Sequence, residues 1–304
     1  MEIQVLGSAA GGGYPQWNCN CSMCNGVRTG SIKARARTQS SIAVSENGTQ
    51  WVIFNTSPDI LTQLKNTPEL HPAKGLRDTP IASIFLLDSQ IDHTTGLLML
   101  REHDSPLSIW CTEQVQQDLT TGNPLFNVLS HYCDIDWHRI TPGETYTGIA
   151  GASNTQFTAL PLISNAPPYS PRRDNPVPGD TLGIVMTDQN NNKIFYAPGL
   201  GQIESHVWEA MQSANTILVD GTMWTDDEMQ KEGVGKKTAR SMGHLPQTGE
   251  GGMLEWLEKL PAATRKVLIH INNTNPILNE NGSEFATLQK LGIEVAFDGM
   301  FIET

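Results

Sequence analysis

The chain has 304 residues, of which 38% are hydrophobic, enough for one large domain or two smaller ones, and a formal net charge of −12. Because that charge repels polyanions, nucleic acid and anionic membranes are disfavoured as partners, and an odd number of five cysteines disfavours a secreted disulfide framework. The N-terminal sequence lacks signal-peptide features and no stretch approaches the roughly 20 apolar residues that span a bilayer, so we expect a cytoplasmic protein without membrane insertion.

Segments of β-strand type dominate the first third of the chain. Residues 40–56 contain two β-rich runs around the sequence ENG, which predicts a hairpin. The continuous apolar run at 81–88 has the length of a strand and is expected to be buried on both faces. Further strands are expected at 2–7 and 107–112, and helical spacing occurs at 95–102.

The second half repeats this alternation of strands and helices. Strands are expected at 157–162, 182–188, 193–199, 215–221, 265–272 and 293–300, and helices at 202–212 and 253–260. Hairpins and alternating β/α units in both halves predict an α/β fold, in which two mixed sheets form a sandwich with helices outside. The irregular stretch 164–181 holds five prolines and two adjacent arginines, and loops of this length are often functional.

Cys19, Cys21 and Cys24 lie in the segment 18–25, NCNCSMCN. Thiolates separated by one and two residues can converge on a tetrahedral zinc ion, with a fourth ligand from a histidine or a carbonyl oxygen elsewhere. Three surface or redox thiols are the alternative. Because a zinc site made mostly of sulfur is structural rather than catalytic, the first interpretation predicts a zinc knuckle that fixes this loop.

Four polar residues, Asp88, Gln90, Asp92 and His93, stand at the end of the predicted buried strand. Ligand sites collect at such strand ends in layered α/β folds, and polar groups there are costly to bury unless they bind something. The Asp–His pair could instead cap the helix that follows, since aspartate is a favoured N-cap residue. The segment alone leaves a ligand site and a helix cap open.

The same segment resembles the signature H-x-H-x-D-H of the metallo-β-lactamase superfamily. Asp92 and His93 match the last two positions, whereas Asp88 and Gln90 stand in place of the two leading histidines. The resemblance implies a late metal-binding histidine after another strand, and His270 in KVLIHINNTNP takes that position.

The resemblance also implies that the ligands of the other superfamily metal site are missing. Its mid-chain histidine and metal-bridging aspartate fall at Asn165 and Gly199. Asp92, His93 and His270 then form a set of two histidines and one carboxylate with open positions, the arrangement that non-haem Fe(II) enzymes use to activate dioxygen. A residual zinc hydrolase and a degenerate site without activity are the alternatives.

A closer resemblance covers residues 1–304. The segments GSAAGGGYPQWNCNCSMCN, RTQSSIAVS, DSQIDHTTGLLMLRE, SNAPPYSPRRDNPVPGDTLG, DGTMWTDDEM, MGHLP and HINNTNPIL are similar to the B-protein family of pyrroloquinoline quinone (PQQ) biosynthesis. The resemblance implies a single metallo-β-lactamase-like domain over 1–304, an αββα sandwich whose two mixed sheets pack face to face.

This family resemblance also implies a reaction. The pathway builds PQQ from a glutamate and a tyrosine of a small peptide, and the B protein would hydroxylate the tyrosine ring of the cross-linked Glu–Tyr intermediate with Fe²⁺. The alternative is a protein that carries PQQ or its precursor for transport to the periplasm. Expected partners are this small-molecule precursor, in the alternative PQQ itself, and other proteins of the pathway. A homodimer is compatible with the sequence.

Related phosphodiesterases of the superfamily carry the same C-x-C-x-x-C spacing, closed by a histidine three residues after the late metal ligand. The equivalent position here is Asn273. The analogy implies that its side-chain oxygen completes the structural Zn²⁺ site. The segment from His270 to Asn273 would then connect the zinc knuckle to the catalytic metal.

His244 and Asp220 complete the catalytic candidates, together with Asp88 and Gln90. Asp220 ends a predicted buried strand, and His244 lies in MGHLP after a glycine-rich stretch. We expect His244 to transfer a proton or to contact substrate, with Asp220 orienting it or binding metal. A surface or packing role is the alternative for the histidine.

Arg172 and Arg173 are the candidates for substrate binding, because a Glu–Tyr-derived substrate carries carboxylates and guanidinium groups form forked hydrogen bonds to them. Solvated charges in a mobile loop are the alternative. The Pro-rich loop that holds both arginines could also close over the substrate and keep water out.

Overall fold

The structure is a computed structural model that describes residues 1–304. The first sheet consists of β1 (Glu2–Gly7), β2 (Ser41–Ser45), β3 (Trp51–Phe54), β4 (Ile81–Phe85), β5 (Leu107–Thr112), β6 (Ile135–Ile140) and β14 (Phe301–Glu303). Its order is β14-β1-β2-β3-β4-β5-β6. The pairs from β14 to β3 are antiparallel and those from β3 to β6 are parallel, so this sheet is mixed.

The second sheet mirrors this organisation. It consists of β7 (Thr145–Tyr146), β8 (Gln156–Pro161), β9 (Leu182–Thr187), β10 (Lys193–Ala197), β11 (Thr216–Asp220), β12 (Arg265–Ile269) and β13 (Ile293–Val295). The order is β13-β12-β11-β10-β9-β8-β7, with parallel pairing from β10 to β13 and antiparallel pairing from β7 to β10. The prediction of two mixed sheets is confirmed.

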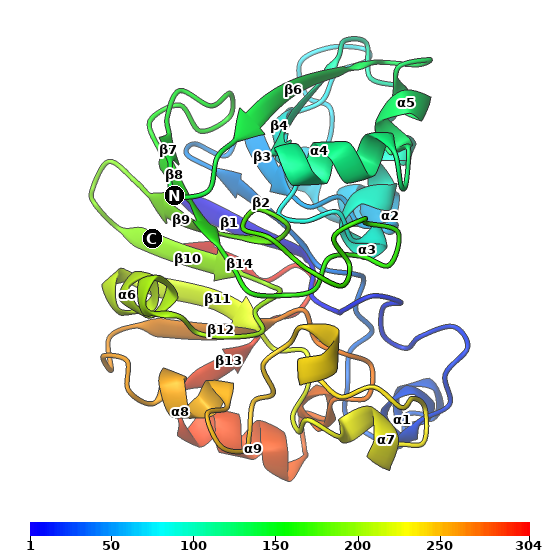
Figure 1. The fold of residues 1–304 in the computed structure, drawn as a ribbon, viewed down its shortest axis with the longest axis vertical. Helices are drawn as coiled ribbons and strands as arrows, with labels where there is room; N and C mark the ends of the chain where they lie inside the picture. Colours follow the sequence, from blue (N-terminus) through cyan, green and yellow to red (C-terminus); the bar gives the residue numbers. More distant parts are fainter.

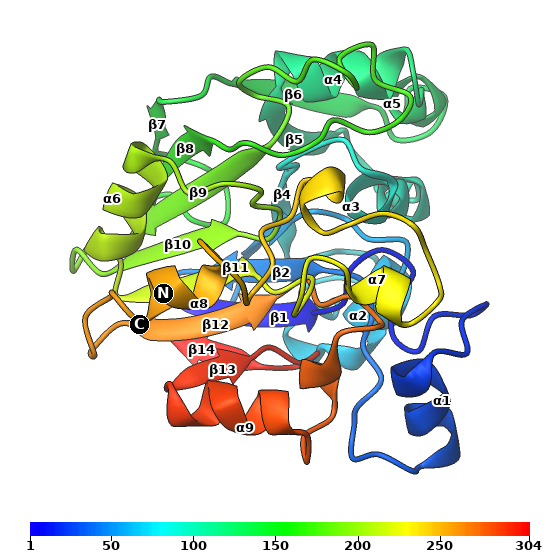
Figure 2. The same ribbon diagram turned by 60° about the horizontal axis from the view of Figure 1, so that its bottom comes forward.

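Helices cover the outer faces of both sheets, and the two sheets face each other between them (Figures 1 and 2). The α-helices are α1 (Ser22–Thr29), α2 (Ile60–Asn66), α3 (Ile91–Thr94), α4 (Glu113–Thr120), α5 (Leu125–Leu129), α6 (Ser205–Ser213), α7 (Glu228–Lys231), α8 (Met253–Leu257) and α9 (Ser283–Lys290). Apolar residues of α2, α4 and α5 pack on the first sheet, and those of α6, α8 and α9 pack on the second. None of the helices has the length and apolar character required to traverse a bilayer.

Side chains of β4 and of the two residues after it, Leu86 and Leu87, alternate between two apolar clusters, and this alternation stabilises the sandwich. Ile84 and Leu86 belong to the apolar cluster beneath the helices, whereas Phe85 and Leu87 belong to the cluster between the sheets. Since successive side chains of a strand point to opposite faces, a strand covered on both sides must be apolar throughout. Each such side chain contributes roughly 1.5–3 kcal/mol of burial free energy. The prediction for 81–88 is thus confirmed.

The loop at 164–181 is irregular, as predicted, but its end is tied to the end of β4. Leu182 N donates to Leu87 O at 2.8 Å, and Thr181 forms an antiparallel bridge with Asp88. The predicted helical stretch at 95–102 is a short 3₁₀-helix, Thr95–Leu100, directly after α3. Both features place polar residues at the carboxyl end of β4.

Candidate metal centre

Polar residues line a cavity of about 390 Å³ at the carboxyl ends of β4, β11 and β12. Parallel strands in each sheet end at this edge, which is where α/β folds gather ligand-binding groups. The cavity lining includes Gln16, Asp88, Gln90, Asp92, His93, Asn165, Arg173, Gly199, Thr222, Lys237, His244 and His270. The structure therefore brings together residues that lie far apart in the sequence.

Asp92, His93 and His270 converge on one point. Oδ2 of Asp92 lies 3.8 Å from Nε2 of His93 and 3.4 Å from Nε2 of His270. Both Nε2 atoms are buried, and neither has a hydrogen-bond partner. Buried polar atoms are almost always bonded, so two orphaned nitrogens facing a carboxylate have the chemistry of a metal-ligand set. These three residues fit an iron ion.

The opposite ring nitrogens are held by hydrogen bonds that leave Nε2 free for a metal. Nδ1 of His93 lies 2.9 and 2.8 Å from the two carboxylate oxygens of Asp88. Nδ1 of His270 lies 3.0 Å from Oγ1 of Thr222, which itself donates to His270 O at 2.9 Å. Because a hydroxyl has one proton, it accepts from Nδ1–H of His270. Such partners fix the tautomer and the ring orientation of a ligand histidine.

The backbone of His270 adopts a left-handed conformation with φ of 62°, which is rare for a residue other than glycine. This conformation costs about 1 kcal/mol and persists only where surrounding contacts enforce it. Thr222 binds the carbonyl oxygen of His270, and the next residue, Ile271, donates to Ser8 O at 2.9 Å. The turn after β12 therefore directs this ring into the cavity.

Electrostatics of the three groups also favour a cation. Burial lowers the pKa of His93, but the carboxylates of Asp88 and Asp92 outweigh it and raise this pKa to about 9. Burial raises the pKa of Asp92, and the neighbouring His93 and His270 outweigh it, so this pKa lies below its usual range. Burial lowers the pKa of His270. Asp92 is thus an anion, and a metal cation can replace the proton of His93.

Asp220 and His244 form a second polar pair beside this set. Nδ1 of His244 donates to Oδ2 of Asp220 over 2.6 Å, and Asp220 is fully buried. The same carboxylate accepts from the backbone of Leu200 and of Thr222. With His270, this pair also has metal-ligand spacing, but His244 Nδ1 and Asp220 already satisfy each other. Burial lowers the pKa of His244, and Asp220 outweighs it and raises that pKa.

Residues at the missing metal positions of the superfamily line the same cavity. Gln90 donates through Nε2 to Asn165 O at 2.9 Å, and Asp88 is engaged by His93. Gly199 faces open space, since a Cβ added there would meet no atom within 4 Å. These groups add no metal ligands, so the cavity presents the set of Asp92, His93 and His270 and, sharing His270 with it, the hydrogen-bonded pair of Asp220 and His244.

The two adjacent arginines have different surroundings, which corrects the expectation for Arg172. Its guanidinium donates to Asp118 at 2.8 Å and to Asp180 at 2.6 Å, both buried, and it does not line the cavity. Arg172 therefore stabilises the loop instead of contacting substrate. Arg173 lines the cavity and donates to Ala166 O.

Gln16, Thr222 and Lys237 are among the polar cavity residues that sequence reasoning missed. Thr222 follows Asp220 at the end of β11, so its place after a buried strand was a usable signal. Lys237 lies in an irregular segment whose position no periodicity reveals. It adds a cation to the cavity wall.

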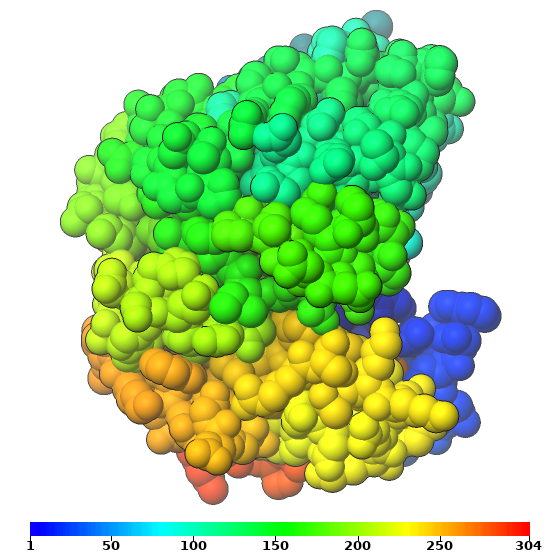
Figure 3. Space-filling model, in the orientation of Figure 1, coloured from blue at the N-terminus to red at the C-terminus, as the bar shows by residue number.

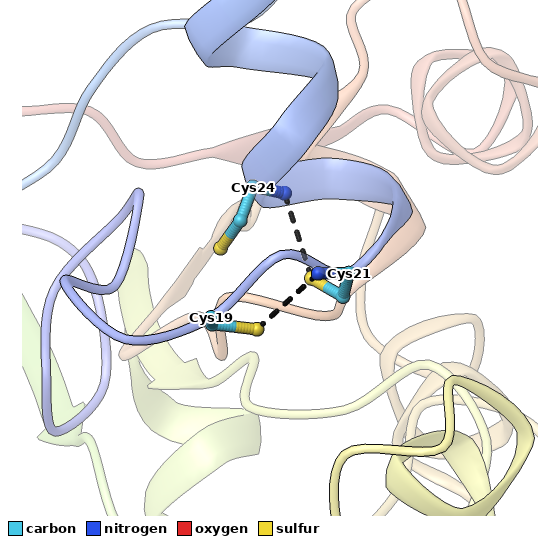
Figure 4. Close-up of side chains that lie close together, drawn as sticks. All are labelled: Cys19, Cys21 and Cys24. Carbon is cyan, nitrogen blue, oxygen red and sulfur yellow. Dashed lines mark hydrogen bonds between the residues drawn. The ribbon is translucent and has the colours of Figure 1, made fainter.

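The three clustered cysteines point their sulfur atoms toward one another (Figure 4). Cys21 caps α1, since its Sγ accepts from Cys24 N at 3.5 Å, so half of the predicted knuckle is the first turn of a helix. Nδ2 of Asn273 lies 3.2 Å from Sγ of Cys19 and 3.3 Å from Sγ of Cys24. The carboxamide therefore meets the thiols as predicted, but with its nitrogen rather than its oxygen nearest them.

The knuckle is anchored at the side of the molecule next to the segment that contains α7. Figure 3 shows the N-terminal residues, in blue, projecting beside the yellow surface of this segment. Ser22 donates through N and Oγ to Glu232, at 3.1 and 2.9 Å.

Since Asn273 follows His270 by three residues, the thiol cluster and the metal-ligand set share one short segment.

Fold and site together define a metal-binding member of the beta-lactamase superfamily, and residues 50–271 match the model of a beta-lactamase superfamily domain. Coenzyme PQQ synthesis protein B of Azoarcus sp. (strain BH72) is 62% identical over 303 residues, which cover 99% of each chain. The same-named protein of Nitrosococcus oceani is 58% identical, again over 99% of each. The crystal structure of Zn²⁺-bound PqqB from Methylobacterium extorquens is 34% identical over 100% of both chains, with a TM-score of 0.92.

The chain therefore belongs to the coenzyme PQQ synthesis protein B family and takes part in PQQ biosynthesis. This confirms the family and the sandwich fold predicted from the sequence motifs.

Proposed function

We propose that this chain hydroxylates the tyrosine ring of the peptide-derived Glu–Tyr intermediate of PQQ biosynthesis in an iron-dependent reaction. The observation that carries the proposal is the pair of buried, unpartnered Nε2 atoms of His93 and His270 beside the carboxylate of Asp92. Two histidines and one carboxylate with open positions are the ligand set of Fe(II) oxygenases. A two-metal hydrolase would need a second independent set, but Asp88 is already bonded to His93, and the mutually bonded pair of Asp220 and His244 would have to share His270 with the first set.

Bound Fe²⁺ would supply activation of dioxygen at the open positions of this set. In the overall reaction a ring C–H bond is replaced by C–OH, the other oxygen atom leaves as water, and two electrons come from an external reductant. The ring must therefore lie beside Asp92, and the walls of the cavity must exclude bulk water.

His244 is positioned to move a proton at its Nε2 atom. Its Nδ1–H donates to Asp220, whereas its Nε2 has no hydrogen-bond partner in the protein. The His244 side chain lines the cavity. Because Asp220 keeps this ring protonated at higher pH than a free histidine, Nε2 can donate a proton and take it back. Thr222 lies 3.1 Å from Nδ1 of His244 and also binds His270, so one hydroxyl aligns both rings.

Arg173 and Lys237 supply the positive charge that a substrate with several carboxylates requires. Both line the cavity and neither forms a salt bridge. Arginine can bind a carboxylate with two parallel hydrogen bonds, and lysine acts as a point charge. We assign substrate orientation to these two side chains.

A structural Zn²⁺ at Cys19, Cys21, Cys24 and Asn273 completes the proposal. Three thiols within reach of one point form most of a tetrahedral site. The two ends of a carboxamide have nearly the same shape, so the oxygen of Asn273 can replace its nitrogen by rotation. The Zn²⁺-bound PqqB of M. extorquens, with its TM-score of 0.92, supports zinc in this family.

The experiment uses apoprotein loaded with Fe²⁺ without oxygen, then mixed with the Glu–Tyr substrate, ascorbate and dioxygen. Oxygen consumption and a product heavier by the ¹⁸O supplied as ¹⁸O₂ are expected. A product labelled only from H₂¹⁸O would favour a hydrolase. Tight binding of unchanged ligand would favour a carrier, and either result would overturn the proposal.

A further inference from the structure

A second cavity, of about 650 Å³, shares no lining residue with the metal centre. It lies between the segment 33–37, helix α9, strand β13 and the connection 296–300, and we call it the edge groove. β13 is the last strand of the second sheet and β14 the last strand of the first. Figure 1 shows β13 and α9 at one end of the molecule, so the groove lies where both sheets are open.

Three cations line the edge groove. The segment 33–37 reads KARAR, in a chain with only 20 lysines and arginines and a net charge of −12. Arg37 forms an isolated antiparallel bridge with Tyr14. Lys33, Arg35 and Arg37 line the groove and the two alanines between them do not, so alternate residues of this segment form one row of cations.

The positive charge of this row is only partly neutralised. One carboxylate, that of Glu280, contacts both Lys33 at 3.2 Å and Arg35 at 2.9 Å. Arg37 is 5% exposed, donates through Nη1 to Ala296 O, and has no partner for its buried Nε. A buried guanidinium without a carboxylate partner is costly unless something else pairs with it.

The other carboxylates near the groove are engaged elsewhere. Glu294 is held by two hydrogen bonds from Arg265. Asp298 accepts from Ser8 and from Thr38, not from Arg37. The edge groove therefore keeps an excess of positive charge.

Another part of the groove lining is the unpaired edge strand β13 with neighbouring apolar side chains. β13 is hydrogen-bonded to β12 on one side and has no strand on the other, so part of its backbone lacks strand partners. Phe285 and Phe297 contribute aromatic surface to the groove, and the Arg35 guanidinium lies 4.6 Å from the centre of the Phe297 ring. This combination matches sites that take up an extended peptide as an added strand.

We propose that the edge groove binds an extended segment of a partner protein that carries acidic residues at alternate positions. In such a segment alternate side chains lie about 6.6 Å apart on one side of the chain, so its carboxylates can approach the row formed by every second residue of 33–37. Its intervening apolar side chains lie against Phe285 and Phe297, and its backbone pairs with β13. The proposal does not depend on the reaction at the metal centre.

The probe is a fluorescein-labelled EVEVE peptide, titrated with the metal-loaded full chain and followed by fluorescence anisotropy. Saturable binding that weakens with added salt is expected, since the contacts are ionic. A peptide of the same composition in the order EEVVE should bind about tenfold more weakly, because its carboxylates lose the two-residue repeat. EVEVE methylated on the backbone nitrogens that face β13 should lose binding as well.

A pair of matched double variants tests the location. Lys33→Glu with Arg35→Glu changes side chains that are 67% and 56% exposed, so the fold should be retained and peptide affinity should fall at least about tenfold. Lys65→Glu with Arg101→Glu, the same charge change at exposed sites elsewhere, should change affinity less than about twofold. Circular dichroism and zinc content serve as folding controls.

Three results would overturn the proposal. They are an absence of saturable EVEVE binding, equal binding by the two double variants, and equal binding of EVEVE and EEVVE. Displacement of EVEVE by benzene-1,3,5-tricarboxylate at equal concentration would also count against it, because the groove would then recognise a free anion rather than an extended chain.

Discussion

Asp88 holds His93 in place through both carboxylate oxygens, which lie 2.9 and 2.8 Å from Nδ1 of the ring. In the superfamily signature, position 88 supplies a metal ligand. Here its carboxylate faces Nδ1 of His93, on the side of the ring away from the candidate ligand atom Nε2, so it positions the ring instead of offering a ligand itself.

Replacing Asp88 by asparagine should lower iron affinity. The amide removes the charge and one acceptor from Nδ1 of His93, and loss of such partners typically costs about 10–100-fold in metal affinity. Competitive Fe²⁺ titration against a chelator measures the effect, with the exposed Asp104→Asn as control. Unchanged affinity would show that His93 does not depend on Asp88.

His244→Gln should lower kcat by on the order of 10²-fold while leaving metal content unchanged. The glutamine amide keeps a hydrogen bond to Asp220 but cannot transfer a proton. Steady-state kinetics and elemental analysis of the same preparation test this, with His206→Gln as control. A loss of iron in parallel with activity would instead make His244 a ligand.

Substitutions of the two adjacent arginines should have different effects, one on substrate binding and the other on stability. Arg173→Gln should raise KM about tenfold with little change in unfolding free energy, because this side chain lines the cavity. Arg172→Ala should cost about 3–5 kcal/mol of stability, since it leaves Asp118 and Asp180 buried without their cation. Urea unfolding and kinetics on both variants provide the comparison, and the reverse pattern would exchange their roles.

Glu228 should make stability depend on pH. Burial raises the pKa of this carboxyl from 4.5 to about 7, although hydrogen bonds from Thr274 and Trp224 oppose the change. The folded state therefore binds the proton more tightly than the unfolded state. Its contribution is complete below pH 4.5 and is lost as pH rises through about 7, a change of about 3 kcal/mol.

Glu228→Gln should remove this pH dependence of the free energy of unfolding. The difference in unfolding free energy between the variant and the unaltered protein is measured at pH 5 and pH 8, at one fixed zinc concentration. The stability of the variant relative to the unaltered protein should be higher at pH 8 than at pH 5 by about 2.5 kcal/mol, because part of the contribution of Glu228 is already lost at pH 5. An equal difference at the two pH values would mean that Glu228 titrates normally.

Asn273→Ala should weaken zinc retention without removing the thiols. The substitution leaves three ligands where tetrahedral zinc requires four. Zinc per chain after dialysis against a mild chelator should fall, whereas Asn281→Ala, an exposed change in the same region, should retain it. Full retention by Asn273→Ala would require the fourth ligand to come from elsewhere.

Most of the strands and the candidate metal-ligand residues could be predicted because each has a local signature. The run at 81–88 is apolar at every position since both faces are covered, and Asp92 and His93 stand directly after it. Strand β6 was not predicted: its sequence, IDWHRI, alternates polar and apolar residues only weakly, and its pairing with β5 at the sheet edge determines its conformation.

The side-chain partners could not be predicted, because they depend on tertiary contacts. Because Arg172 and Arg173 are adjacent in the sequence, the sequence does not show which of them forms the salt bridges with Asp118 and Asp180. Likewise the role of Thr222 appears only when β11 and β12 lie side by side and bring it to His270.

The open space at Gly199 bears on whether this chain could be given a second metal site. The Cβ of an aspartate placed there would meet no atom within 4 Å, so the start of that side chain is not obstructed. The barrier is Asp88: restoring a histidine at that position would deprive His93 of the carboxylate that aligns it. A second metal-ligand set at these positions would therefore disturb His93 before the new set was complete, so single substitutions that build it would first weaken the existing set.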